Sequence, residues 1–165
     1  MRRKVLVFVS AAAVLGLLVG TLVFRSASAI TTARTITVIA PDTEQRRLDF
    51  GPNGPSQGDL LVFAGPLRNA ANTRTIGRID GTCVTTSNPA GPEEERRQCT
   101  ITSSFDRPTP PGAEITITGV GRVLAEDVLM AVAGGTRDFQ NARGQALVDY
   151  TTTTGQITIT YSLIP

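Results

Sequence analysis

Apolar and polar residues alternate with a period of two along much of the chain beyond residue 30. Near the C-terminus, Ile157, Ile159, Tyr161 and Leu163 are separated by Thr and Ser side chains, and residues 114–118 repeat the pattern. Strict alternation is typical of a β-strand that buries one face. No window carries a sustained apolar pattern at helical spacing, so we expect a chain built from strands.

Three runs rich in Gly, Pro, Asn and Asp interrupt this alternation. They are residues 49–58 (DFGPNGPSQG), 88–92 (NPAGP) and 106–112 (DRPTPPG), and they favour turns because Gly and Pro suit the dihedral angles that turns require. Between the breaks we predict eight short strands, near residues 33–40, 59–64, 74–86, 97–105, 113–123, 127–133, 143–152 and 156–164. The pattern predicts an all-β barrel or sandwich with no second domain.

The predicted last strand, residues 156–164, has one apolar face and one hydroxyl-rich face. In a small barrel, the apolar face could point inward and fill the lumen. It could equally point outward into a subunit contact and leave a Thr-lined interior. The alternation alone does not choose between these two orientations.

The first 29 residues have the three parts of a secretory signal peptide. Arg2, Arg3 and Lys4 precede an uncharged run over residues 5–24, and residues 27–29 (ASA) match a small-residue cleavage site. We expect cleavage after this site, a barrel domain over residues 30–165, and a secreted protein. The alternative is an uncleaved anchor that holds the domain at the outer face of the cytoplasmic membrane, because a run of about 20 apolar residues can span a bilayer.

Charge and composition exclude several classes of function. Four of the 16 basic groups lie in the leader, so residues 30–165 carry 12 basic and 14 acidic side chains, a net charge of −2. This balance provides no basic surface for nucleic acid. The absence of His excludes Ser-His-Asp catalysis and His-containing metal sites, and two Cys are too few for a Cys-only zinc site. No metal or cofactor motif is visible.

The two cysteines, Cys83 and Cys99, each lie in a predicted strand, with the turn-rich run at residues 88–92 between them. A hairpin centred on that turn would place the two residues opposite each other. In an oxidising compartment, a disulfide is expected, and closing a loop of this length stabilises the fold by about 3 kcal/mol. The alternative is a free Cys83 thiol in a cavity.

Four ordered stretches carry a resemblance to a known family. They are residues 58–67 (GDLLVFAGPL), 76–83 (IGRIDGTC), 126–136 (EDVLMAVAGGT) and 139–145 (FQNARGQ). Together they resemble the allene oxide cyclase and dirigent protein superfamily, in particular its small secreted bacterial members. The resemblance implies an eight-stranded antiparallel β-barrel, often trimeric, with a cavity for a hydrophobic ligand. Gly134, Gly135 and Gly144 would then be structural, at turns or close backbone approaches.

Most of the residues that the superfamily uses for its activity have no counterpart in this sequence. Plant cyclases of the superfamily use a Glu in the first strand, which here contains no carboxylate. Their Asn position corresponds to Gly65, and their Tyr position falls at Gly121 or Arg122, while a dirigent Asp is replaced by Leu129. Only Cys83 matches. The sequence therefore disfavours plant-type cyclisation and leaves open whether the chain is an enzyme; any activity would be of the isomerase or cyclase type.

Five charged residues are candidates for the ligand cavity: Asp42, Glu44, Asp59, Arg78 and Arg122. The first two follow the first strand, and the last two lie within strands. The alternatives are a solvent-exposed position for each, or a turn-capping role for Asp59.

We expect a secreted barrel that binds a small apolar molecule in its lumen and steers its cyclisation or coupling, without a cofactor. The alternative is a non-catalytic cell-envelope interaction or structural protein on the same barrel. It predicts a filled core and an outward apolar patch, which oligomerisation could cover.

Overall fold

The computed structural model describes residues 34–87, 94–106, 112–122, 127–151 and 155–164. In chain order, these residues form β1 (Arg34–Ala40), β2 (Glu44–Leu48), β3 (Leu60–Asn69), β4 (Thr75–Ser87), β5 (Arg96–Phe105), β6 (Ala113–Arg122), β7 (Asp127–Gly135), the 3-10 helix η1 (Arg137–Phe139), β8 (Arg143–Thr151) and β9 (Gln156–Ile164). The predicted leader and its cleavage site lie outside the described residues. In the described ranges, no helix is long and apolar enough to cross a membrane.

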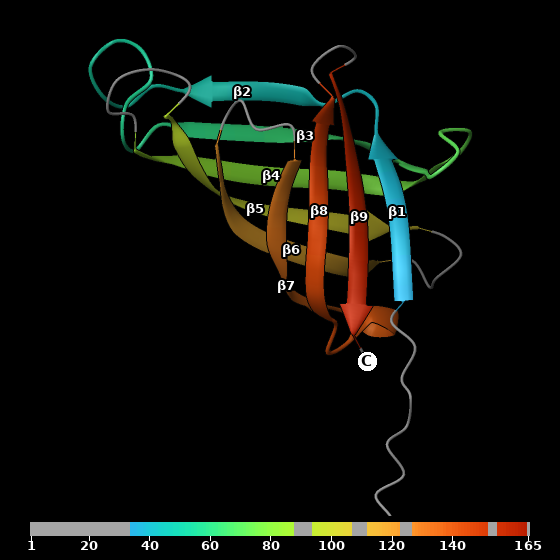
Figure 1. Ribbon diagram of the computed structural model, residues 1–165. Helices are drawn as coiled ribbons and strands as arrows, with labels where there is room; N and C mark the ends of the chain where they lie inside the picture. The colour runs from blue at the N-terminus through green and yellow to red at the C-terminus, as the bar shows by residue number, and fades with distance from the viewer. Residues whose placement is uncertain (1–33, 88–93, 107–111, 123–126, 152–154, 165) are drawn as a thin grey trace, which may run out of the picture. The chain divides into compact units, whose positions relative to one another are not determined.

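The strands form one antiparallel sheet that closes on itself. Each strand from β3 to β9 pairs with the next, and β1 pairs along β9 and also with the end of β3, where Val38 lies opposite Asn69. In Figure 1, β8 and β9 cross in front of β3, β4 and β5. The prediction of an eight-stranded antiparallel barrel is confirmed, with β1 and β3–β9 as its eight strands.

The ninth strand, β2, was not predicted from the sequence. Its residues EQRRL carry charges on both faces, so they show no apolar alternation. The strand forms because it pairs with the outer edge of β3, from Glu44 opposite Ala64 to Leu48 opposite Leu60. Strand β3 is also longer than predicted, since it continues through Gly65 and Pro66. There its outer edge lacks a strand partner between β2 and β1, a position that tolerates proline.

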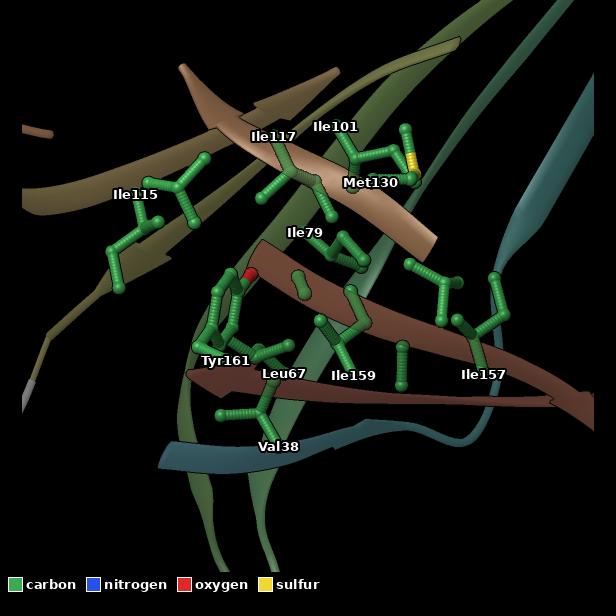
Figure 2. Close-up of a cluster of buried hydrophobic side chains, with 14 of the residues drawn as sticks. Val38, Leu67, Ile79, Ile101, Ile115, Ile117, Met130, Ile157, Ile159 and Tyr161 are labelled. Atoms are coloured by element: carbon green, nitrogen blue, oxygen red, sulfur yellow. The ribbon is translucent and has the colours of Figure 1, made fainter. Parts of the chain in front are cut away.

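The apolar face of β9 points into the barrel. Ile157, Ile159, Tyr161 and Leu163 are all buried, which settles the orientation that the sequence left open. Figure 2 shows Ile159 and Tyr161 among inward side chains from several strands, including Leu67 of β3. Much of the lumen is therefore a packed hydrophobic core.

The end of the barrel beside η1 is closed by aromatic packing. Phe139 of η1 lies 5.2 Å from Phe105, measured between ring centroids, and the guanidinium of Arg34 stacks over the Phe139 ring at 5.3 Å. This packing fills the lumen at that end.

The hairpin of β4 and β5 has the predicted register. Gly77 lies opposite Phe105 at one end, and Cys83 lies directly opposite Cys99, with 4.0 Å between their Cα atoms. The predicted disulfide joins them, so Cys83 is not a free thiol.

Candidate functional site

The transition from packed core to cavity occurs along β6. Its inward positions carry Ile115 and Ile117 and then Gly119 and Gly121. The two isoleucines fill the lumen, whereas the glycines put no side chain into it. A Cβ at position 121 would lie 2.9 Å from Cγ2 of Val128, closer than side chains normally approach. The glycines therefore let Met130 and Val128 of β7 pack directly against β6, and β6 itself puts no side chain into this part of the lumen.

A cavity of about 260 Å³ occupies this end of the barrel. Its apolar wall consists of Leu61, Phe63, Gly119, Gly121, Val128, Met130, Ile157 and the Cys83–Cys99 disulfide. Its polar lining consists of Gln45, Arg97, Arg122 and Tyr150. No carboxylate lines it among the described residues, so its charged lining is cationic. Such a site, mostly apolar with a few polar groups, is typical of small-molecule binding.

A cluster of four charged side chains lies beside the cavity. Nη2 of Arg97 is 2.7 Å from Oε1 of buried Glu95, and Nη2 of Arg47 is 3.1 Å from Oδ2 of buried Asp59. Arg47 also lies 3.8 Å from Glu95, and the Thr85 hydroxyl donates to Glu95 over 3.3 Å. The buried carboxylates are thus paired with cations, as burial requires. The cluster fixes the direction of the Arg97 guanidinium.

Asp59 organises the loop that precedes β3. Its carboxylate accepts hydrogen bonds from the backbone N–H groups of Ser56 and Phe50, from the Ser56 hydroxyl and from Arg47. These donors, the Ser56 N–H foremost, stabilise the charged form and lower the pKa of Asp59 to about 2, despite its burial. Of the two expectations for Asp59, the structure places it in the turn-organising position.

Two tyrosines contact the core but differ in their hydroxyl groups. The hydroxyl of Tyr161 lies 2.6 Å from the hydroxyl of Ser103, deep in the core, and burial raises the pKa of Tyr161 to about 12. Tyr150 instead lines the cavity. Burial raises the pKa of Tyr150 too, while the charge of nearby Arg97 acts in the opposite direction. The Tyr150 side chain is half-buried and packs against the core.

The other charged candidates occupy different surroundings. Asp42 and Glu44 are exposed and, with Arg78, line an open depression beside the β1–β2 corner. The Arg78 side chain is 62% exposed and pairs with Asp80 at 3.0 Å, so it does not enter the lumen. Arg122 contributes to the cavity lining from an exposed position at the end of β6. The structure thus brings one of the five candidates to the cavity and three to the separate depression.

Sequence reasoning missed Arg97, Tyr150, Gly119 and Gly121. The alternation along β6 could have predicted that both glycines face the lumen, because they continue the inward positions of Ile115 and Ile117. This signal was weaker for Arg97, because this residue shares the inward parity of Cys99 and Ile101 but its charge breaks their apolar pattern.

The glycines of the resemblance lie at irregular backbone positions. Gly134 and Gly144 have φ values of +154° and +134°, and Gly134 flanks a register shift between β6 and β7. A Cβ at Gly135 would lie 2.6 Å from the carbonyl oxygen of Glu114.

In the described part of the chain, no group of three His, Cys, Asp or Glu side chains could hold a metal ion.

Comparisons with known proteins agree with this architecture. The sequence model of one family, described as dirigent-like protein, matches residues 23–164. Among solved structures, the chain is similar to a pyocyanin demethylase, with 24% identity and a TM-score of 0.66 over 79% of this chain and 99% of that chain.

Two further solved structures extend the comparison. The pterocarpan synthase dirigent protein PsPTS1 has 22% identity and a TM-score of 0.58, over 80% of this chain and 92% of that chain. The Diels Alderase AbmU from Streptomyces koyangensis has 15% identity and a TM-score of 0.60, over 86% and 73%. No curated protein sequence matches the chain. At these identities, the similarities establish the fold, and function must be argued from the site.

Proposed function

Because the chain belongs to the dirigent-like protein family, we propose that it binds one small apolar molecule in the open end of its barrel and steers the cyclisation of that molecule. Family membership confirms the superfamily resemblance inferred from the sequence. The observation that carries the proposal is the cavity of about 260 Å³, lined in part by Gly119 and Gly121, in an otherwise filled lumen.

The size of the cavity favours ring closure within one molecule. Ligand pockets usually measure about 300–1,000 Å³, so this cavity accommodates one compact ring system. Coupling would require two such molecules side by side. The names of the solved relatives, which include a Diels Alderase and a pterocarpan synthase dirigent protein, support a ring-closing role.

The chemistry of the lining favours steering over covalent catalysis. The two sulfurs are tied in a disulfide, and the described lining holds no carboxylate. Apolar walls can hold a flexible substrate in a reactive conformation and exclude water from it. Any acceleration would then arise mainly from positioning.

Secretion is part of the proposal. The basic start, apolar run and small-residue site of the leader support export and cleavage after residue 29, with a retained N-terminal anchor as the alternative. An oxidising destination would also suit the disulfide.

Native mass spectrometry of the full chain, recovered after export from its host cell, tests these points together. We expect a mass that begins at residue 30, an intact disulfide and a co-purified small molecule that solvent extraction can identify. A ligand-free protein that also binds no member of a library of small apolar ring compounds would contradict the binding role.

A matched pair of variants locates the bound molecule. Leu61→Trp puts a large ring into the cavity and should abolish binding. Leu60→Trp, at the neighbouring outward position of β3, should leave binding unchanged. Equal binding by both variants would place the molecule outside the lumen.

A second candidate is a non-catalytic cell-envelope interaction protein that acts as a homo-oligomer. One observation favours it: exposed apolar side chains on the outward face of β4 and β6–β8, namely Val84, Val120, Leu129 and Leu147. The superfamily resemblance suggests a trimer. Discovery of a lumen ligand together with turnover would remove the non-catalytic part of this alternative.

A further inference from the structure

The cavity is lined by a half-buried tyrosine whose hydroxyl has no hydrogen-bond partner among the described residues. In the described residues, the hydroxyl of Tyr161 bonds to Ser103, whereas the hydroxyl of Tyr150 makes no hydrogen bond to another described residue. A polar group in a mostly apolar cavity is more stable with a hydrogen-bond partner than without one. The arrangement therefore favours a ligand atom as the partner of Tyr150.

The neighbouring Arg97 provides a second donor. Both Nε and Nη2 of Arg97 contact Oε1 of Glu95, at 2.8 and 2.7 Å. Nη1 makes no hydrogen bond or ion pair with the described residues. A guanidinium is rigid and planar, so this contact with Glu95 fixes the plane in which Nη1 presents its hydrogens. Because the side chain lines the cavity, Nη1 is available to a ligand.

The remainder of the lining supplies nothing that would favour a cationic ligand. The apolar wall suits a hydrocarbon ring, and the described charged lining consists of Arg97 and Arg122. A neutral phenol and a guanidinium both donate, so their natural complement is an oxygen that accepts.

We propose that the Tyr150 hydroxyl and Nη1 of Arg97 form a two-donor anchor that selects small ring compounds carrying an acceptor oxygen, such as a carbonyl or phenolate oxygen. This inference rests on the proposed lumen site and names the class of molecule that the site takes. The ring lies against the apolar wall, and the anchored oxygen fixes its orientation for ring closure.

Two probes of the same shape test the anchor on the full chain after export. 2-Acetylnaphthalene carries a carbonyl oxygen, and 2-isopropenylnaphthalene replaces that oxygen by a methylene group. Equilibrium dialysis gives the two dissociation constants. We expect the oxygen-bearing probe to bind about tenfold more tightly, because two hydrogen bonds are lost with the hydrocarbon.

Variants assign the preference to individual donors. Tyr150→Phe removes only the hydroxyl oxygen and should reduce the preference about fivefold, while the affinity for the hydrocarbon stays the same. Arg97→Lys keeps a positive charge beside Glu95 but loses the planar fork, and it should also reduce the preference. The matched control is Tyr161→Phe, whose hydroxyl is bonded to Ser103 and lies outside the cavity lining; it should leave the preference unchanged.

The outcomes separate the two proposals. If both probes bind equally, compete with each other and are excluded by Leu61→Trp, the lumen site stands and the anchor is wrong. If the preference survives in both Tyr150→Phe and Arg97→Lys, the anchor is also wrong. If neither probe binds, and no co-purified molecule is found, the lumen site and its anchor both fail.

Discussion

At the scale of single residues, the absence of side chains determines how much of the lumen stays open. Phe63 can point inward because Gly81 lies opposite it on β4, and a Cβ at that position would overlap the ring. The ring then forms part of the cavity wall. Gly119 and Gly121 act differently, since they withhold side chains where Ile115 and Ile117 supply them. These residues separate a rigid core from a binding space.

The buried pair Tyr161 and Ser103 gives a prediction at this scale. Tyr161→Phe leaves the Ser103 hydroxyl without its partner in the core, so we expect a loss of about 1–3 kcal/mol in the free energy of unfolding. Adding Ser103→Ala removes the orphaned group and should restore most of that loss. Urea denaturation of both single variants and the double variant measures the coupling; a double variant no more stable than Tyr161→Phe alone would contradict it.

At the scale of elements, the loop before β3 depends on the charge of Asp59. The pKa of Asp59 is lowered from 3.8 to about 2 in the folded protein, so its ionised form contributes stability above the unfolded pKa. That contribution should be lost as the pH falls from about 4 through about 2. Asp59→Asn should be less stable than the parent at pH 7 and should show a smaller loss over the acid range.

Thermal unfolding at a series of pH values measures both effects. The control is Asp80→Asn, which removes an exposed ion pair with Arg78 and should change stability by less than about 0.5 kcal/mol. Identical acid profiles for the parent and Asp59→Asn would show that Asp59 does not hold the loop.

The hairpin of β4 and β5 gives a second prediction for an element. The disulfide closes a loop with a sequence separation of 16 between the cysteines. Replacing both by Ala, as Cys83→Ala with Cys99→Ala, should lower the free energy of unfolding by about 3 kcal/mol, because the unfolded chain regains conformational freedom. Chemical denaturation checks this, with the parent under reducing conditions as a comparison. A loss below about 1 kcal/mol would indicate that the hairpin register alone secures this region.

The sequence predicted those elements whose residues alternate clearly. Ile157, Ile159 and Tyr161 indicated β9, and the two cysteines indicated the register of β4 and β5. Strand β2 was not predicted because its residues show no alternation of polar and apolar side chains. It forms a strand because it pairs with β3. The same limit affects the site: Tyr150 lies at the end of β8, and its place in the lumen depends on the curvature of a closed sheet.

Alternation could have corrected one error about the site. Ile79 and Cys83 occupy inward positions of β4, so Arg78 must point outward by strand parity. Asp42 and Glu44 were favoured because they follow the first strand of the barrel, but both are exposed. The described cavity instead presents donors, a property that depends on register across several strands.

At the scale of the whole barrel, a hydrophobic core fills one end of the lumen, and the cavity lies at the other end. The core at the closed end holds the strands rigidly, while the open end carries the cavity, the disulfide and the charged cluster. A ligand site on strands is held more precisely than one on loops. Such rigidity suits a protein that acts by fixing the conformation of its ligand.

The outer face of the barrel leads to the last prediction. Leu129 lies directly opposite Leu147 on β7 and β8, and their side chains are 58% and 42% exposed. Adjacent exposed apolar side chains on a sheet favour contact with another protein surface. We expect copies of this chain to associate through this face. Sedimentation equilibrium of the exported protein should show an oligomer, and Leu129→Asp with Leu147→Asp should convert it to a monomer. Thr100→Asp, at an exposed position of β5, should leave the oligomer intact. A parent protein that sediments as a monomer at micromolar concentration would exclude self-association through these leucines.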